Sequence, residues 1–121
     1  MFVRGIRGAI TVENNEKTEI LEATSELLSE IIDKNEVRPE DISWVFITVT
    51  HDLNATFPAQ AIRRLKGWEL VPLMCSLEID VPGGLPKCIR LLMQVNTEKR
   101  QDQIVHVYLN EAKRLRPDLS S

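Results

Sequence analysis

The chain has 121 residues, of which 43% are hydrophobic, so it is long and apolar enough to bury a core of its own. Its formal net charge is −3, with acidic and basic residues intermixed. Proteins that bind nucleic acid or another polyanion carry a clustered basic excess, so the sequence predicts no such partner. It also predicts no membrane partner, because no apolar run is long enough to span a bilayer.

A chain of this length is expected to form a single domain over residues 1–121. The first ten residues, MFVRGIRGAI, place two arginines where a signal peptide needs an unbroken apolar segment. Cys75 and Cys88 lack the CxxC spacing of a redox or zinc motif. We therefore predict a cytoplasmic protein with free thiols, and a Cys75–Cys88 disulfide is the less favoured alternative.

Residues 2–11 alternate like a strand, and the run RGIRGA places two glycines inside it. Glycines within a strand indicate close approach of another backbone or of a ligand. The alternative is an edge strand whose arginines extend into solvent.

The next segment is an amphipathic helix that Asn14 or Asn15 can cap and that ends near Asn35. A short helical turn at 39–41 leads to a strand at 43–50 that is apolar on both faces, as a central strand would be. His51 and Asp52 follow this strand. Neighbouring side chains on an extended chain point apart, so we interpret His51 as a loop residue rather than half of an acid–base pair.

A second helix is expected at 58–66, beginning with proline and ending at Gly67, and a third strand at 69–75. A last short strand at 104–109 carries His106 and Tyr108. The basic segment from Ala112 onward is broken by Pro117 and is expected to be mobile. The two histidines have no third ligand at metal spacing, so no metal is expected.

The strand around Arg90 follows a Pro-Gly-Gly turn at 82–84. One face carries Ile89, Leu91, Met93 and Val95, and the other carries Cys88, Arg90, Leu92 and Gln94. An arginine in the middle of a leucine-bearing face is costly without a partner. Either Glu78 or an anionic ligand can be that partner.

These elements predict an α+β fold with a mixed five-stranded sheet packed on one long helix. One helix covers only one face of such a sheet, yet the middle strands are apolar on both faces. The bare face must be buried by another copy of the chain, so we predict an obligate oligomer with any ligand on the oligomer-facing side, where Arg90 points.

The polar side chains that can face such a site include three arginines, one acid, one thiol and one phenol: Arg7, Arg63, Arg90, Glu78, Cys75 and Tyr108. No Ser-His-Asp set is present, and Cys75 has no histidine partner in the sequence. Such a site suits a small dianion with a hydroxyl group. It can catalyse only a reaction that needs positioning and electrostatics.

Five segments taken together, RGIRGA (4–9), FPAQAIR (57–63), MCSLEIDVPGGLPKCIR (74–90), DQIVHVYL (102–109) and LRPDL (115–119), resemble the monofunctional chorismate mutases of the trimeric α/β type. The resemblance covers essentially the whole chain. It implies a homotrimeric pseudo α/β-barrel with sites at the subunit interfaces. It also implies conversion of chorismate to prephenate, on the way to phenylalanine and tyrosine, by an intramolecular Claisen rearrangement without a cofactor.

The same resemblance implies roles for individual residues. Arg90 and Glu78 are the expected catalytic pair, with Arg90 donating to the ether oxygen and Glu78 taking the ring hydroxyl. The remaining expected substrate-binding residues are Arg7, Tyr108, the Cys75 region (Met74, Cys75, Ser76, Leu77), a wall from a neighbouring subunit (Phe57, Ala59, Gln60, Arg63) and Leu115 of a closing tail. The sequence departs from the family pattern at Gln60, where a lysine is common, and at Met74, where a threonine is common.

Two alternative functions remain from the residues alone. A small trimeric imine or enamine deaminase would also hold a substrate carboxylate with an arginine, but it has no need of Glu78 at a hydroxyl-binding position. The other alternative, from a different class, is a non-catalytic anion-sensing module.

Overall fold

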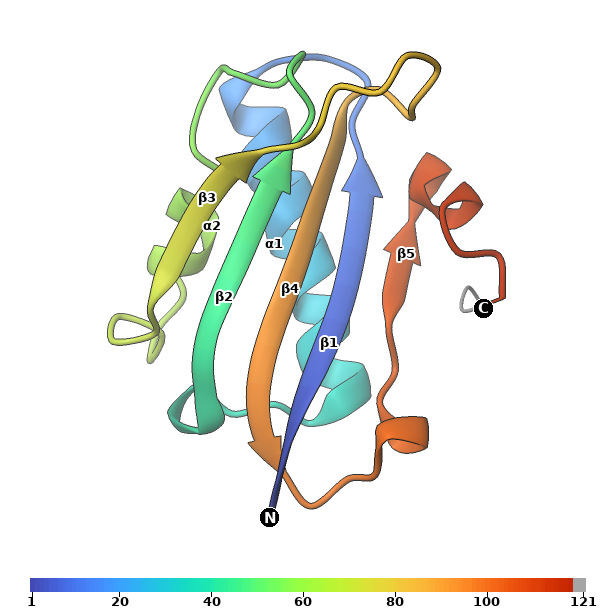
Figure 1. The fold of residues 1–121 in the computed structure, drawn as a ribbon. Coiled ribbons are helices and arrows are strands. Elements are labelled where there is room, and N and C mark those ends of the chain that lie inside the picture. Colours follow the sequence, from blue (N-terminus) through green and yellow to red (C-terminus); the bar gives the residue numbers. More distant parts are fainter. Residues whose placement is uncertain (119–121) are drawn as a thin grey trace.

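The computed structural model describes residues 1–118, and within them five strands form one mixed sheet in the order β3-β2-β4-β1-β5 (Figure 1). Strand β4 lies at the centre and is antiparallel to β1 and β2, while β5 is parallel to β1 and β3 is parallel to β2. The strands are β1 (Phe2–Thr11), β2 (Ile42–Val49), β3 (Leu73–Leu77), β4 (Cys88–Thr97) and β5 (Val107–Leu109). The predicted α+β class and mixed five-stranded sheet are confirmed.

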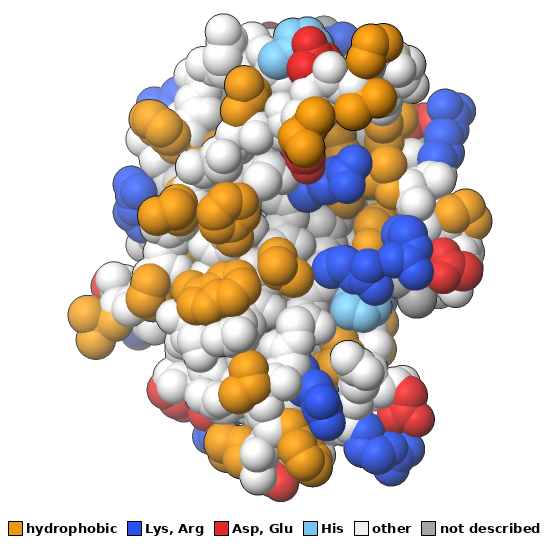
Figure 2. Space-filling model, viewed as in Figure 1, with side chains coloured by type: hydrophobic (Ala, Val, Ile, Leu, Met, Phe, Trp, Pro, Cys, Tyr) orange, Lys and Arg blue, Asp and Glu red, His pale blue; other side chains and the backbone are white. Residues whose placement is uncertain are grey.

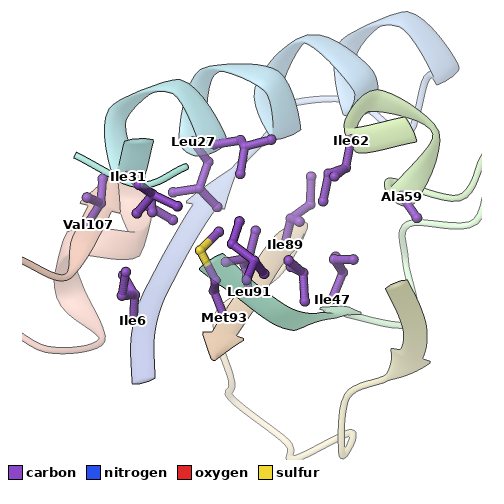
Figure 3. Close-up of a cluster of buried hydrophobic side chains, with 14 of the residues drawn as sticks. Ile6, Leu27, Ile31, Ile47, Ala59, Ile62, Ile89, Leu91, Met93 and Val107 are labelled. Atoms are coloured by element: carbon purple, nitrogen blue, oxygen red, sulfur yellow. The ribbon is translucent and has the colours of Figure 1, made fainter. Parts of the chain in front are cut away.

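Helix α1 (Lys17–Asn35) lies behind the sheet, and the short helix α2 (Ala59–Arg63) extends this layer (Figure 1). Short 3₁₀ helices occupy Pro39–Asp41, Gln101–Gln103 and Asn110–Arg114. Leu27 and Ile31 of α1 lie over Ile89, Leu91 and Met93 of β4 (Figure 3), and all five side chains are buried. The main core therefore lies on this side of the sheet, and a smaller buried cluster of Ala9, Cys88, Tyr108 and Ala112 lies on the other side.

Gly8 explains why β1 can approach α1 so closely. A Cβ added at Gly8 would lie 2.8 Å from Ile31 Cδ1 and 3.1 Å from Leu27 Cδ1. At Gly8 the close approach that the sequence predicts is thus made by helix side chains, while the Val107 carbonyl oxygen lies at an ordinary contact distance of 3.4 Å from that Cβ.

No α-helix of the described residues covers the opposite face of the sheet (Figure 1), and only the 3₁₀ helix Asn110–Arg114 packs on its β1–β5 side, through Ala112. The strand register places Ser76, Thr48, Arg90, Ala9 and Tyr108 in one row across this face. In Figure 2, hydrophobic side chains gather over β3 and β2, whereas basic side chains gather toward β1 and β5. The uncovered face therefore has an apolar half and a cationic half.

The predicted cap of α1 is wrong. Glu16 occupies the N-cap position without a side-chain hydrogen bond, and Glu19 in the first turn accepts from the backbone N–H groups of Glu13 and Asn14 instead. The Asn15 side chain accepts from the backbone N–H groups of residues 54 and 55, so it ties down a distant loop and cannot cap the helix.

The bounds of three predicted elements also change, and the last strand, β5, begins at Val107 rather than at residue 104. Helix α2 ends at Arg63 because the chain then tightens into turns that bury Trp68, and Gly67 takes a positive φ of 90° within them. Strand β3 begins at Leu73, since a turn occupies Trp68–Val71 and pairing with β2 starts only beyond Pro72. The tail segment predicted to be mobile is instead docked at Ala112, which is fully buried, and at Leu115.

Candidate active site

The uncovered face carries an ion pair between Arg90 and Glu78. Arg90 Nε lies 3.1 Å from Glu78 Oε1, and the same oxygen accepts a hydrogen bond of 2.7 Å from the Thr48 hydroxyl. The side chains of Arg90 and Glu78 are 48% and 22% exposed, so solvent and a ligand can reach the pair. The sequence left either Glu78 or an anionic ligand as the partner of Arg90, and the structure shows Glu78 in that role. The Nε–H that contacts Glu78 is one of the five N–H donors of the guanidinium group.

A groove of about 600 Å³ runs along this face beside Arg90. Ligand pockets in proteins commonly enclose about 300–1,000 Å³. The groove is lined by Arg7, Gly8 and Ala9 of β1, Phe46 and Thr48 of β2, Arg90, Leu91 and Leu92 of β4, Tyr108 of β5, and Leu115 and Arg116 of the tail. Four expected site residues, Arg7, Arg90, Tyr108 and Leu115, are therefore brought together although three different strands and the tail carry them.

Arg116 lines the groove and was missed by sequence reasoning. Its guanidinium group binds both carboxylate oxygens of Asp118, with Nε 3.1 Å from Oδ1 and Nη2 2.9 Å from Oδ2. The Arg-Pro-Asp order in the sequence allows such a local pair but gives no sign that the tail turns back onto the sheet. Of the resemblance segment that includes this order, Leu119 lies outside the described residues.

His106 fixes the backbone at Arg7. Its Nδ1 accepts a hydrogen bond of 2.9 Å from the Arg7 backbone N–H. Burial lowers the pKa of His106, and the guanidinium groups of Arg7 and Arg116 lower it further. The neutral imidazole that this favours is the form in which Nδ1 can accept the bond.

Both cysteines have free thiols, so the alternative of a disulfide is excluded. The Cys75 side chain packs against the core, because its partner in β2, Ile47, faces α1. Cys88 lies on the Arg90 face but is buried with Ala9, Tyr108 and Ala112. Burial raises the pKa of the Cys88 thiol despite the nearby Arg90, and a neutral buried thiol is a poor nucleophile.

Other expected residues lie outside the groove. Met74 lines an apolar hollow of about 410 Å³ beside it, while Ser76 and Leu77 are exposed on β3. Around α2, Phe57 is 67% exposed and Arg63 is exposed, whereas Ala59 is buried in the core. Gln60 is half-buried and accepts a hydrogen bond from the Thr56 hydroxyl. This chain alone does not bring the α2 group to Arg90.

The loop pair His51 and Asp52 does point apart. His51 Nδ1 lies 3.1 Å from Asp80, and Asp52 turns inward to bind the backbone at Lys87. Among residues 1–118, no group of three or more His, Cys, Asp or Glu side chains could hold a metal ion. None of the helices described is long and apolar enough to cross a membrane.

The fold and the groove define an α+β protein whose open sheet face carries cationic donors suited to a small anion. Arg7 and Arg90 supply cationic donors, Glu78 supplies an acceptor beside them, and Phe46 and Leu92 supply apolar walls. No activated nucleophile is present among the groove residues, so the chemistry available is binding, orientation and electrostatic stabilisation.

Comparison with known proteins agrees with this fold and these groove residues. A family model described as chorismate mutase type I matches residues 3–119, and the chain belongs to that family. The chorismate mutase AroH of Bacillus subtilis (strain 168) is 53% identical over 120 residues, covering 99% of this chain and 94% of that protein. The chorismate mutase AroH of Thermus thermophilus is 50% identical over 121 residues, covering 99% and 98%.

A solved structure is also similar. The chorismate mutase from Clostridium thermocellum superimposes with a TM-score of 0.87 at 52% identity, covering 90% of this chain and 96% of that one. The family and the α+β fold of the single chain are therefore those that the sequence resemblance predicted.

Proposed function

We propose that this protein is a chorismate mutase that rearranges chorismate to prephenate in the groove beside Arg90. The observation that carries the proposal is the Arg90–Glu78 pair in a groove with Arg7 and Tyr108, in a chain that matches the family over residues 3–119. Chorismate has two carboxylates and one hydroxyl, which suit arginine donors and one carboxylate acceptor. The protein would act in aromatic amino acid synthesis in the cytoplasm.

The reaction is an intramolecular Claisen rearrangement, in which one C–O bond breaks while a C–C bond forms. Negative charge grows on the ether oxygen in the transition state. Arg90 is the donor placed to stabilise that charge, because its side chain lines the groove and is half exposed there. Glu78 accepts from the ring hydroxyl, and Arg7 and Tyr108 hold the carboxylate end of the substrate.

We propose that the active assembly is a homotrimer with sites at the subunit interfaces. Exposed apolar side chains on the uncovered side of the molecule, among them Met74 and Leu92, support burial against another copy (Figure 2). The position of Phe57 and Arg63 outside the groove of their own chain supports their delivery to a neighbour's groove.

The family match does not favour a deaminase or a simple anion sensor. The decisive assay is the loss of chorismate ultraviolet absorbance on adding purified protein after exhaustive chelation and dialysis. We expect turnover without any metal or organic cofactor. Binding of chorismate without turnover would support the sensor instead, and activity that depends on an added metal would overturn the mechanism.

Mixed assemblies test the interface site. Arg63→Ala and Arg90→Ala damage different subunits' contributions to one site, so mixing and re-annealing the two inactive variants would restore some intact sites. We expect partial recovery of activity in the mixture and none in either variant alone. An active monomer by light scattering, or no recovery in a mixture proven to exchange subunits, would contradict the interfacial trimer.

A further inference from the structure

Asp52, in the loop that follows β2, makes an unusual set of bonds at the start of β4. Its two oxygens accept from the Lys87 backbone N–H at 3.1 Å (Oδ1) and 3.0 Å (Oδ2). The Thr50 hydroxyl donates to Oδ1 at 2.5 Å, and the same hydroxyl accepts from the Cys88 backbone N–H at 3.0 Å. One carboxylate and one hydroxyl thus hold two successive backbone donors.

The backbone that these bonds hold is in an uncommon conformation. Lys87 has a φ of 49°, in the left-handed region that a residue with a Cβ rarely adopts. Its carbonyl accepts from the Val12 backbone N–H at 3.0 Å, and the Cys88 carbonyl accepts from the Thr50 N–H at 3.1 Å. Such a conformation persists only where its surroundings fix it. Among the groups that fix this conformation, the Asp52 carboxylate is the charged one.

Arg90 follows Lys87 by three residues and lies on the same face of β4 as Cys88. Its partner Glu78 is anchored separately, through its N–H to the Val49 carbonyl at 2.9 Å and through the Thr48 hydroxyl. The segment 48–52 therefore positions both members of the ion pair. Thr48 and Val49 hold Glu78, and Asp52 holds the start of the strand that carries Arg90. Asp52, Glu78 and Arg90 border the same hollow of about 240 Å³.

We infer that Asp52 is a positioning residue for the reaction: it holds the left-handed turn at Lys87 and so directs the Arg90 guanidinium group toward Glu78 and the groove. This rests on the role proposed above for Arg90. Burial alone would raise the pKa of Asp52, but the hydrogen bonds from Thr50 and Lys87 outweigh it and lower the pKa, so the side chain is a carboxylate at neutral pH.

Asp52→Asn is the matched test, because the amide keeps the shape but removes the charge and turns one acceptor into a donor that faces the Lys87 N–H. Asp41→Asn is the control, since Asp41 is also a half-buried acid with a polar partner, Arg38, but it lies next to the opposite end of β2. Activity is measured at saturating and at low chorismate, well below the melting temperature of each full-length variant. Assembly size is measured in parallel.

We expect Asp52→Asn to lower kcat by about 10- to 100-fold, as a displaced catalytic group does, with a smaller change in KM and an unchanged assembly. Asp41→Asn keeps the kcat of the parent protein. A normal kcat in a folded Asp52→Asn variant overturns the inference. So does a lower KM at normal kcat, which would mean that the Asp52 charge acts on the substrate directly.

A double variant separates positioning from a general structural role. In an Arg90→Lys background, we expect Asp52→Asn to change kcat by less than about twofold, because the group it positions is already lost. A full additional loss in that background overturns the inference. If Asp52→Asn does not fold, Thr50→Val is the second variant, because it removes the hydroxyl that links Asp52 to the Cys88 backbone. We then expect Thr50→Val to lower kcat in the parent protein but not in the Arg90→Lys background. An unchanged kcat in Thr50→Val overturns the inference.

The role of Arg90 and the positioning role of Asp52 are contradicted by different results. A normal kcat in Arg90→Lys overturns the role of Arg90 and the inference with it. An impaired Arg90→Lys together with a normal Asp52→Asn overturns the inference alone.

Discussion

On β4, Ile89, Leu91 and Met93 are buried against α1, while the side chain of Arg90 between them is 48% exposed on the other face. The two faces of one strand thus have different neighbours: helix side chains on one, and Glu78, the tail and the groove on the other. A change on the core face should reduce stability and leave the chemistry intact. A change on the open face should do the reverse.

Arg90→Ala is expected to give the largest effect on activity. Loss of a preorganised donor to developing charge costs about 10²–10³ in rate, and we expect kcat/KM to fall by at least that much. The free energy of unfolding should change little, because a half-exposed ion pair contributes only about 0–1 kcal/mol. Kinetics and thermal melting on the same preparation check both statements. A variant that loses activity by unfolding would contradict the division between faces.

Glu78→Ala is expected to come next. A hydrogen bond to a charged group is worth about 1.5–3 kcal/mol, which corresponds to a loss of about 10- to 100-fold in kcat/KM. The variant should stay folded, since its role is to hold substrate at a loop edge. Glu22→Ala, an exposed acid on α1, is the control and should retain activity. If Glu78 merely balances Arg90, the melting temperature will fall and the folded fraction will remain active.

Met93→Ala makes the opposite change on the same strand. Met93 is fully buried, and truncation of a buried Met to Ala typically costs about 2–5 kcal/mol of stability. We expect urea unfolding at a lower midpoint and a kcat close to that of the parent at temperatures where the variant is folded. A large loss of kcat in the folded variant would show that the two faces are coupled.

The smallest effect concerns His106. Burial and the charges of Arg7 and Arg116 lower its pKa, so the folded protein binds this proton more weakly than the unfolded chain does. Its contribution to stability is complete above the ordinary histidine pKa of about 6.5 and is lost as pH falls through the folded pKa. His106→Asn keeps an acceptor but does not titrate, so the fall in melting temperature with pH should become shallower. His51→Asn is the control, and an equal change in both variants would contradict this assignment.

The fold was largely predictable because its main signals are local. Alternation assigned the two faces of β4 correctly, and helical spacing located α1 to its end at Asn35. The errors arise where a distant contact decides the local structure. Asn15 binds the loop at residues 54–55 and so does not cap α1, and burial of Trp68 shortens α2 and delays β3.

The site residues show the same difference between local signals, which the sequence reveals, and distant contacts, which it does not. The resemblance named Arg7, Arg90, Tyr108 and Leu115, and the structure gathers them in one groove, although their roles remain predictions. Thr48 and Arg116 were missed. Thr48 belongs to none of the resemblance segments, and Arg116 lies in one but carries no expected role. The register of β2 and the path of the tail bring them to the site. The Cys75 side chain faces the core, so any contact that Cys75 makes with a ligand on the open face would have to come from its backbone.

The most direct test of the central claim is the steady-state kinetics of Arg90→Lys at saturating chorismate. Lysine keeps the positive charge but loses the planar fork, so one ammonium group cannot serve Glu78, a carboxylate and the ether oxygen in the same geometry. If Arg90 stabilises the transition state, kcat falls severely and KM changes less. If Arg90 only attracts a dianion into the groove, KM rises while kcat is retained, and a lysine variant with near-normal kcat would contradict electrostatic catalysis by Arg90.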